Sequence, residues 1–170
     1  YFENFDSIFS GRKKHLKIDP KDDLRGKKWE KIATSINLFI FSTAGLAVAL
    51  LQIYGNTLIY HEVSYTFSSI AYLPASFFLA LAIHDFYFYL THRLLHTPWL
   101  FRKVHITHHK SHSPNAWSAF SFHPVEGVLQ IGIVPLVAFI LPIHEAVLIV
   151  FTAFLLFMSV YGHSAYELRP

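Results

Sequence analysis

Long stretches without a charged side chain constrain this chain more than any other feature. Residues 32–61 contain no Asp, Glu, Lys or Arg, and Ile36–Ile53 is almost entirely apolar. A second uncharged run covers residues 63–83, and two further runs cover 127–144 and 146–161. A helix rises 1.5 Å per residue, so about 20 apolar residues cross the hydrocarbon core of a bilayer. The sequence therefore predicts an all-α integral membrane helical bundle of about four spans in two hairpins.

The composition supports this interpretation and limits the chemistry. Hydrophobic residues make up 53% of the 170 residues, above the roughly 45–50% of an ordinary soluble domain. The chain has no cysteine, which excludes a disulfide framework and a thiolate metal site. Any metal must be held by nitrogen or oxygen, and the 12 histidines are the obvious donors.

The positive charges indicate how the spans are oriented. Most of the 14 lysines and arginines lie in the first 35 residues, and the others lie between residues 91 and 124 or at Arg169. Two hairpins place all these segments on one face, which the positive-inside rule identifies as cytosolic. We expect a multi-pass protein of a bacterial inner membrane or the endoplasmic reticulum. A basic run beside an apolar span is typical of a membrane flank, so we expect no nucleic-acid partner.

Two regions follow from this pattern. We expect residues 1–35 to form a cytosolic juxtamembrane segment and residues 36–170 to form a membrane-embedded domain. The chain begins at Tyr1 without an initiator Met and stops at Pro170, so we expect truncation, above all at the C-terminus. The last two uncharged runs are near the lower length limit for crossing a bilayer. They predict either a tight pair of helices or a re-entrant hairpin.

Histidines cluster in one short segment between the second and third uncharged runs. An HxxxH motif and an HxxHH motif are formed by His92, His96, His105, His108 and His109. On a helix, spacings of three and four residues place side chains on one face, so each motif can converge on a point. Pro98 disfavours helical geometry at Thr97 and separates the motifs. The sequence predicts a histidine-rich helical cap that holds metal at the cytosolic surface.

The donor set narrows the choice of metal. All-imidazole sites suit iron, zinc, copper or nickel, whereas magnesium and calcium prefer oxygen ligands. No HExxH motif occurs, which argues against a zinc protease. A single catalytic zinc needs only three protein ligands, so five clustered histidines fit two metal ions better.

Four sequence blocks occur in an order that resembles a known family. They are DFYFYLTHRLLH at 85–96, HITHH at 105–109, FHPVE at 122–126 and GHSAYE at 162–167. Over about residues 80–170 the chain resembles the fatty acid hydroxylase and sterol desaturase superfamily. The resemblance implies a helical membrane enzyme that uses two irons, molecular oxygen and electrons to hydroxylate or desaturate C–H bonds of lipids.

The resemblance also implies a ligand set. The implied metal ligands are His92, His96, His105, His108, His109, His163 and, as a weaker candidate, His123. Asp85 lies two helical turns before His92 and could accept a hydrogen bond from a ligand imidazole, or serve as a helix-end charge. Glu126 and Glu167 could act in the same way or lie at the interface. His84 stays ambiguous, and residues 86–89 are expected to pack and to form an aromatic belt.

Members of the superfamily normally carry a further histidine cluster. A second HxxHH follows their GHxxxE-like block, and this chain stops before such a motif. Six or seven histidines are few ligands for two irons. We therefore expect the fragment to bind metal weakly and to be inactive by itself.

Three functional hypotheses follow. The first is iron- and oxygen-dependent hydroxylation or desaturation of a membrane lipid, such as a sterol or fatty acyl chain, with an electron-donor protein as partner. The second is a membrane zinc hydrolase acting on a lipid amide, and zinc is also a substitute for iron in the first. The third is a non-enzymatic metal transporter or sensor. That function predicts ionisable groups inside the spans, and the runs 32–61 and 63–83 contain no charged residue.

Overall fold

The part of the chain that the computed structural model describes, residues 20–109 and 115–163, folds almost entirely into helices. The helices are α1 Pro20–Ile53, α2 Phe67–Leu95, α3 Pro98–Leu100, α4 Ile106–His109, α5 Pro124–Ile131, α6 Ile133–Ile140 and α7 Glu145–Gly162. The remaining elements are a π-helical turn η1 Phe101–His105, a 3-10 turn η2 Ser118–Phe120, and the two-residue strands β1 Ile59–Tyr60 and β2 Ile143–His144. The predicted all-α fold class is confirmed.

Three of the helices are long and apolar enough to cross a membrane. They are Gly26–Ile53 within α1, the whole of α2, and α7. Only 11% of the most apolar window of each is buried inside the protein. Because so much apolar surface cannot face water, these helices require the hydrocarbon of a bilayer. The prediction of a helical membrane protein is confirmed, with α5 and α6 as a shorter apolar segment in place of another full-length span.

The segment formed by α5 and α6 is divided at Gly132. Pro135 lies in the first turn of α6 and has no N–H to donate to the preceding turn, which interrupts the helical ladder. The Tyr87 hydroxyl of α2 donates to the Leu129 carbonyl at 2.6 Å and so satisfies a carbonyl near the break. The last two uncharged runs therefore form a pair of helical segments joined through β2.

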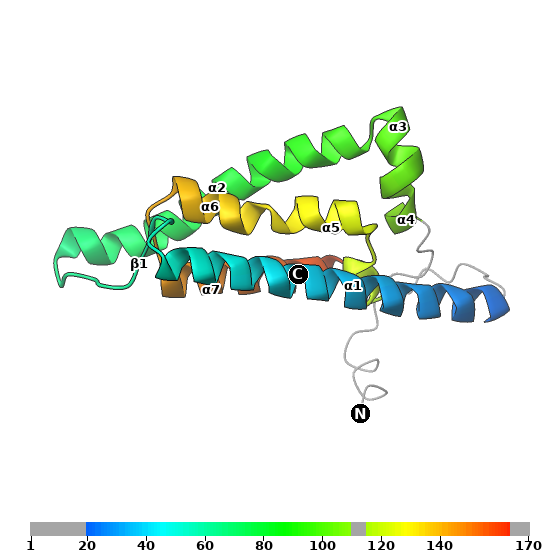
Figure 1. The fold of residues 1–170 in the computed structure, drawn as a ribbon, viewed down its shortest axis with the longest axis horizontal. Coiled ribbons are helices and arrows are strands. Elements are labelled where there is room, and N and C mark those ends of the chain that lie inside the picture. Colours follow the sequence, from blue (N-terminus) through cyan, green and yellow to red (C-terminus); the bar gives the residue numbers. More distant parts are fainter. Residues whose placement is uncertain (1–19, 110–114, 164–170) are drawn as a thin grey trace, which may run out of the picture.

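The two hairpin bends meet at one end of the bundle. β1 follows α1 and β2 follows α6, and the strands pair in parallel with Ile59 opposite Ile143. His61 lies 2.8 Å from the Glu145 carboxylate and adds a polar contact between the bends. Figure 1 shows α3 and α4 at the opposite end from β1. The bends of both hairpins thus lie at one end of the bundle, and the histidine segment between the hairpins lies at the other.

The start of α1 packs against the segment before α5. The Thr34 hydroxyl donates to the Trp117 carbonyl at 2.6 Å, and the Glu30 carboxylate accepts from the Asn115 amide at 2.7 Å. Glu30 and Thr34 are therefore buried, although we expected this stretch to be a solvated flank. The helix α1 also continues without a break across the expected boundary between residues 35 and 36.

Candidate metal centre

The HxxxH motif lies where α2 ends. His92 occupies the last turn of α2, and His96 caps the helix with its backbone N–H directed to the His92 carbonyl. The Nε2 atoms of these two rings are 3.1 Å apart. Thr97 is extended and Pro98 begins α3, so the predicted break after the first motif is confirmed.

The HxxHH motif lies on the next two helical turns. His105 ends the π-helical turn η1, and His108 and His109 follow on α4. The Nε2 atoms of His105 and His109 are also 3.1 Å apart. Single π-helical turns occur frequently at functional sites because they redirect side chains within a helix.

The two motifs converge on one point. One ligand nitrogen from each of His92, His96 and His105 lies within 4.8 Å of the other two. The His96 ring is centred 4.8 Å from that of His105 and 5.6 Å from that of His109. Two imidazole nitrogens bound at about 2.1 Å to one ion, at a right angle, lie about 3 Å apart. The 3.1 Å spacing within each motif fits such a shared ion.

A second pair of histidines adjoins this group. The His108 ring is centred 5.4 Å from the His163 ring, which stands at the end of α7. Nδ1 of His108 is buried and has no hydrogen-bond partner among the described residues. Nδ1 of His163 lies 2.8 Å from the Ser159 carbonyl, so it carries the proton and leaves Nε2 as a free donor to metal. Donor atoms of this kind fit a metal-binding role.

Glu126 supports the centre from α5. One of its carboxylate oxygens lies 2.9 Å from Nδ1 of His105, and both side chains are 1% exposed. This contact leaves Nε2 of His105 for a metal ion and holds the ring in place. The second carboxylate oxygen of Glu126 is buried without a partner among the described residues.

The protonation states fit neutral imidazole ligands. Burial and then the neighbouring histidines lower the pKa of His105 to about 4. Burial and then His163 lower the pKa of His108 to about 4. Both rings are therefore neutral near pH 7, as metal binding requires. Burial raises the pKa of Glu126, which lies outside the three long spans, to about 8, and a cation beside it would act in the opposite direction.

The structure brings together six of the seven histidines that the resemblance implied. The seventh, His123, lies outside this group, at the start of α5. Nδ1 of His123 accepts a hydrogen bond from the Val125 N–H and caps α5. The side chain of Asp85 is 82% exposed and pairs with His84 at 3.1 Å. Of the carboxylates that we considered for an imidazole contact, Glu126 is the one that makes it. Glu167 lies outside the described residues.

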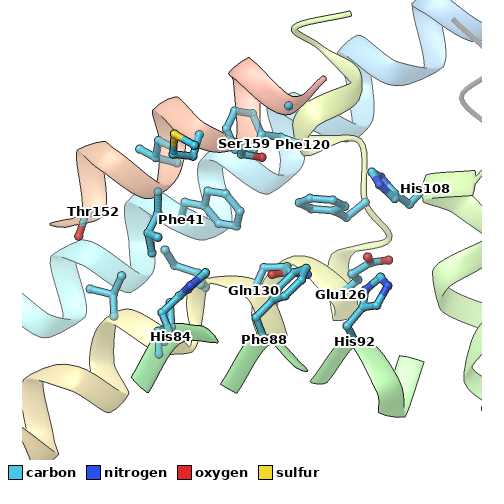
Figure 2. A pocket seen from close by; sticks show the side chains of 18 of the residues that line it. Phe41, His84, Phe88, His92, His108, Phe120, Glu126, Gln130, Thr152 and Ser159 are labelled. Atoms are coloured by element: carbon cyan, nitrogen blue, oxygen red, sulfur yellow. The ribbon is translucent and has the colours of Figure 1, made fainter. Parts of the chain in front are cut away.

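A cavity of about 350 Å³ opens beside the histidines and runs between the helices. His92, His108 and Glu126 lie at one end of it, and His84 and Thr152 lie at the other (Figure 2). Phe88 stacks on His92, with ring centroids 5.3 Å apart, and on His84, with centroids 5.9 Å apart. Phe88 is thus a cavity wall, not only packing as we expected.

Sequence reasoning missed part of the cavity wall. Gln130 of α5 and Thr152 and Ser159 of α7 all line it. Each stands within an apolar run that we interpreted only as a span. Their polar side chains within uncharged runs were the sequence feature that could have indicated a cavity.

Replacing Glu126 by Gln should weaken metal binding about 10- to 100-fold, the usual effect of removing a charged partner of a ligand histidine. The amide keeps the shape of the side chain but loses the negative charge that increases the donor strength of His105. Competition with a chelator, followed by elemental analysis, measures the affinity. Glu145→Gln is the matched control, because Glu145 pairs with His61 at the other end of the bundle. Equal affinities of the two variants would contradict this role.

The comparisons with known proteins concern the same part of the chain. Over 113 residues the chain is 30% identical to a Delta(7)-sterol 5(6)-desaturase of Saccharomyces cerevisiae, which covers 66% of this chain and 31% of the relative. Methylsterol monooxygenase 2-1 of Arabidopsis thaliana is 36% identical over 76 residues, 45% of this chain and 28% of the relative. Lathosterol oxidase of Mus musculus is 27% identical over 118 residues, 69% of this chain and 40% of the relative.

The matched part of the chain thus spans roughly a quarter to two fifths of the length of these relatives. No solved structure matches. The model of the fatty acid hydroxylase family matches residues 77–170, which is more than half of the chain and includes every histidine of the cluster. The protein therefore belongs to the fatty acid hydroxylase family, within the superfamily that also contains the sterol desaturases.

Proposed function

We propose that the complete gene product oxidises a sterol or a similar membrane lipid at a metal centre formed by the histidine cluster. The observation that carries this proposal is the cavity, which has metal-ligand side chains at one end and an apolar wall between the helices. A volume of about 350 Å³ lies within the range of sites for small organic molecules. A lipid substrate can enter such a site from the surrounding bilayer.

The donor set supports iron as the metal, with two ions in the complete protein. Five imidazoles from the two motifs and a sixth from His163 suit iron, and they exceed the needs of one zinc ion. Bound iron supplies the activation of molecular oxygen that attack on an unreactive C–H bond requires. Zinc remains the substitute that the same donors would accept.

The side chains of this chain prepare the centre for that chemistry. His92, His96 and His105 direct ligand nitrogens to one point, and Glu126 fixes the His105 ring by its contact with Nδ1. Phe88 and Phe122 lie against ligand histidines and form walls of the cavity, which keep water away from the reacting carbon. The protein thereby orients the lipid and excludes competing reactions.

The relatives favour a sterol over other lipids. The three described above are named as a sterol desaturase, a methylsterol monooxygenase and a lathosterol oxidase. These names support an oxidation and give no support to a lipid amide hydrolase or a metal transporter. Desaturation and hydroxylation both begin with removal of hydrogen from carbon, so both outcomes are included in the proposal.

The distribution of charges supports the orientation and the partners. In the described part of the chain, the start of α1 and the turn η1 carry basic residues and lie at the end of the bundle where the histidines lie, which the positive-inside rule makes cytosolic. An electron-donor protein can reach the centre from that side, because His96 is exposed. We propose a bacterial inner membrane or the endoplasmic reticulum as the location, residues 1–35 as a juxtamembrane segment, and residues 36–170 as part of the membrane-embedded domain.

Membranes containing the complete gene product should convert a Delta(7)-sterol only when oxygen and a reductant are present. Mass spectrometry would show either the loss of two hydrogens or the gain of one oxygen atom. The His108→Ala variant should form no product, because it lacks a buried ligand nitrogen. Conversion without oxygen would overturn the proposed oxidation. Unchanged product from the variant would overturn the assignment of the reaction to the histidine cluster.

A further inference from the structure

Within the described residues, one polar side chain in the cavity wall has no hydrogen-bond partner. Gln130 of α5 lines the cavity, and the described residues provide no hydrogen bond to its amide group. Figure 2 shows Gln130 between the ends of the cavity, near Phe88 and Glu126. A primary amide offers two donors and two acceptor sites, so an apolar ligand beside it would leave these groups unpaired.

The other polar groups beyond the metal centre are already engaged. The Thr152 hydroxyl donates to the Leu148 carbonyl at 2.8 Å, within its own helix. The Ser159 hydroxyl donates to the Ala119 carbonyl, and His84 pairs with Asp85. Outside the metal centre, where Glu126 and His108 also have unpaired atoms, Gln130 is therefore the described side chain of this wall that is free to recognise a polar atom of a ligand.

The position of Gln130 sets where that polar atom would lie. Gln130 follows Glu126 by four residues, which is about one helical turn or 6 Å along α5. Glu126 itself contacts the metal-ligand candidate His105. A ligand atom bound by Gln130 would thus lie about one helical turn from the level of Glu126, in the same cavity as the histidines.

We propose that Gln130 binds the 3-hydroxyl group of a sterol substrate and selects this class over unbranched acyl chains. This inference rests on the proposed function. The hydroxyl of a 3-hydroxysterol is three or four bonds from carbons 5 and 6 of the ring system, or within about 5 Å. An acyl chain oxidised near its middle has its nearest oxygen about 10 Å away. A sterol oxidised at these carbons can place an oxygen at the level of Gln130 while a carbon faces the histidines, whereas an acyl chain oxidised near its middle cannot.

The hydroxyl also matches the amide chemically. A hydroxyl donates one hydrogen bond and accepts others, so it can pair with both the carbonyl and the NH₂ of Gln130. Gln130 is half-buried, and a bound ligand would enclose its amide. A site that binds a hydroxyl discriminates strongly against an analogue that lacks it, because the polar groups that the ligand encloses then stay unpaired. The residue is accordingly a determinant of specificity.

The test compares binding of a 3-hydroxysterol with binding of its 3-deoxy analogue. The complete gene product would be purified in nanodiscs, and each sterol would displace a radiolabelled 3-hydroxysterol. The wild-type protein should prefer the hydroxysterol at least about tenfold, and Gln130→Leu should reduce this ratio to nearly one. The variant should bind the 3-deoxy analogue as well as the wild type does, which shows that it is folded. Thr152→Val is the matched control and should keep the wild-type ratio, because its hydroxyl is engaged within α7.

Each other outcome overturns a defined part of the argument. If Gln130→Leu keeps the preference, or if Thr152→Val loses it equally, the assignment to Gln130 is wrong. If the wild type binds both sterols equally, the inference fails while the proposed sterol function stands. If the wild type binds neither sterol, the proposed sterol function fails and the inference with it.

Discussion

The His105→Ala variant should lose its metal and its oxidation activity together, with turnover reduced by at least about a hundredfold. Loss of a group that only supports a ligand costs 10- to 100-fold, and His105 is itself a candidate ligand. Its ring lies beside those of His92, His96, His108 and His109. Removing His105 takes away a candidate metal ligand that lies between the two motifs. It also leaves the buried Glu126 carboxylate without its partner.

Elemental analysis of the purified protein and product analysis in membranes would measure these two effects. The control is His61→Ala, because His61 lies at the opposite end and pairs there with the partly exposed Glu145. That variant should retain its metal content and turnover. A His105→Ala protein with the wild-type metal content would show that the histidine cluster holds no metal through this ring.

The Gly127→Ala variant should lose about 2–5 kcal/mol of its free energy of unfolding. A Cβ atom at this position would overlap the side-chain amide of Asn37, which belongs to α1. Asn37 is fully buried and donates to the Phe120 and Phe122 carbonyls, at 2.9 Å each. Displacing it adds the strain of an overpacked contact, about 1–3 kcal/mol, to a similar cost for unpaired buried carbonyls.

Thermal unfolding in detergent would measure the change, with Gly45→Ala as the matched control. Gly45 also lies in a helix, but an added Cβ atom there meets nothing within 4 Å. The control should be neutral or stabilise the helix by up to about 1 kcal/mol, since alanine favours helices over glycine. Equal midpoints for both variants would show that α1 and α5 do not pack closely at Gly127.

The histidine cluster illustrates how far a local pattern can be used. Spacings of three and four residues predicted which rings share a face, and the 3.1 Å contacts confirm this for the spacing of four, between His92 and His96 and between His105 and His109. The break at Thr97 was equally predictable, because Pro98 restricts the residue before it. These features depend on neighbours within one or two helical turns, so they can be predicted from the local sequence.

The support of the cluster was predictable only in part, because the sequence offered Asp85 and Glu126 as candidates without deciding between them. Helix periodicity pointed to Asp85, which shares α2 with His92, but its side chain is exposed beside His84. The group that contacts His105 is Glu126, 21 residues away on another helix. Periodicity identifies candidates on the same element, whereas a partner from another element depends on how the helices pack.

The sequence by itself determined the helical membrane-protein class, the apolar runs and the histidine motifs, whereas the structure has three long spans and a shorter apolar segment in place of the expected four spans. Hydrophobicity and short-range spacing act along the chain, and each can be interpreted without knowledge of the packing. The tertiary structure decided which polar residues of the apolar runs face the cavity, among them Gln130 and Thr152. It also decided that Asn37 and Gly127 bring α1 and α5 into close contact. Such choices depend on side chains from helices far apart in sequence, because only their packing sets which face of each helix is enclosed.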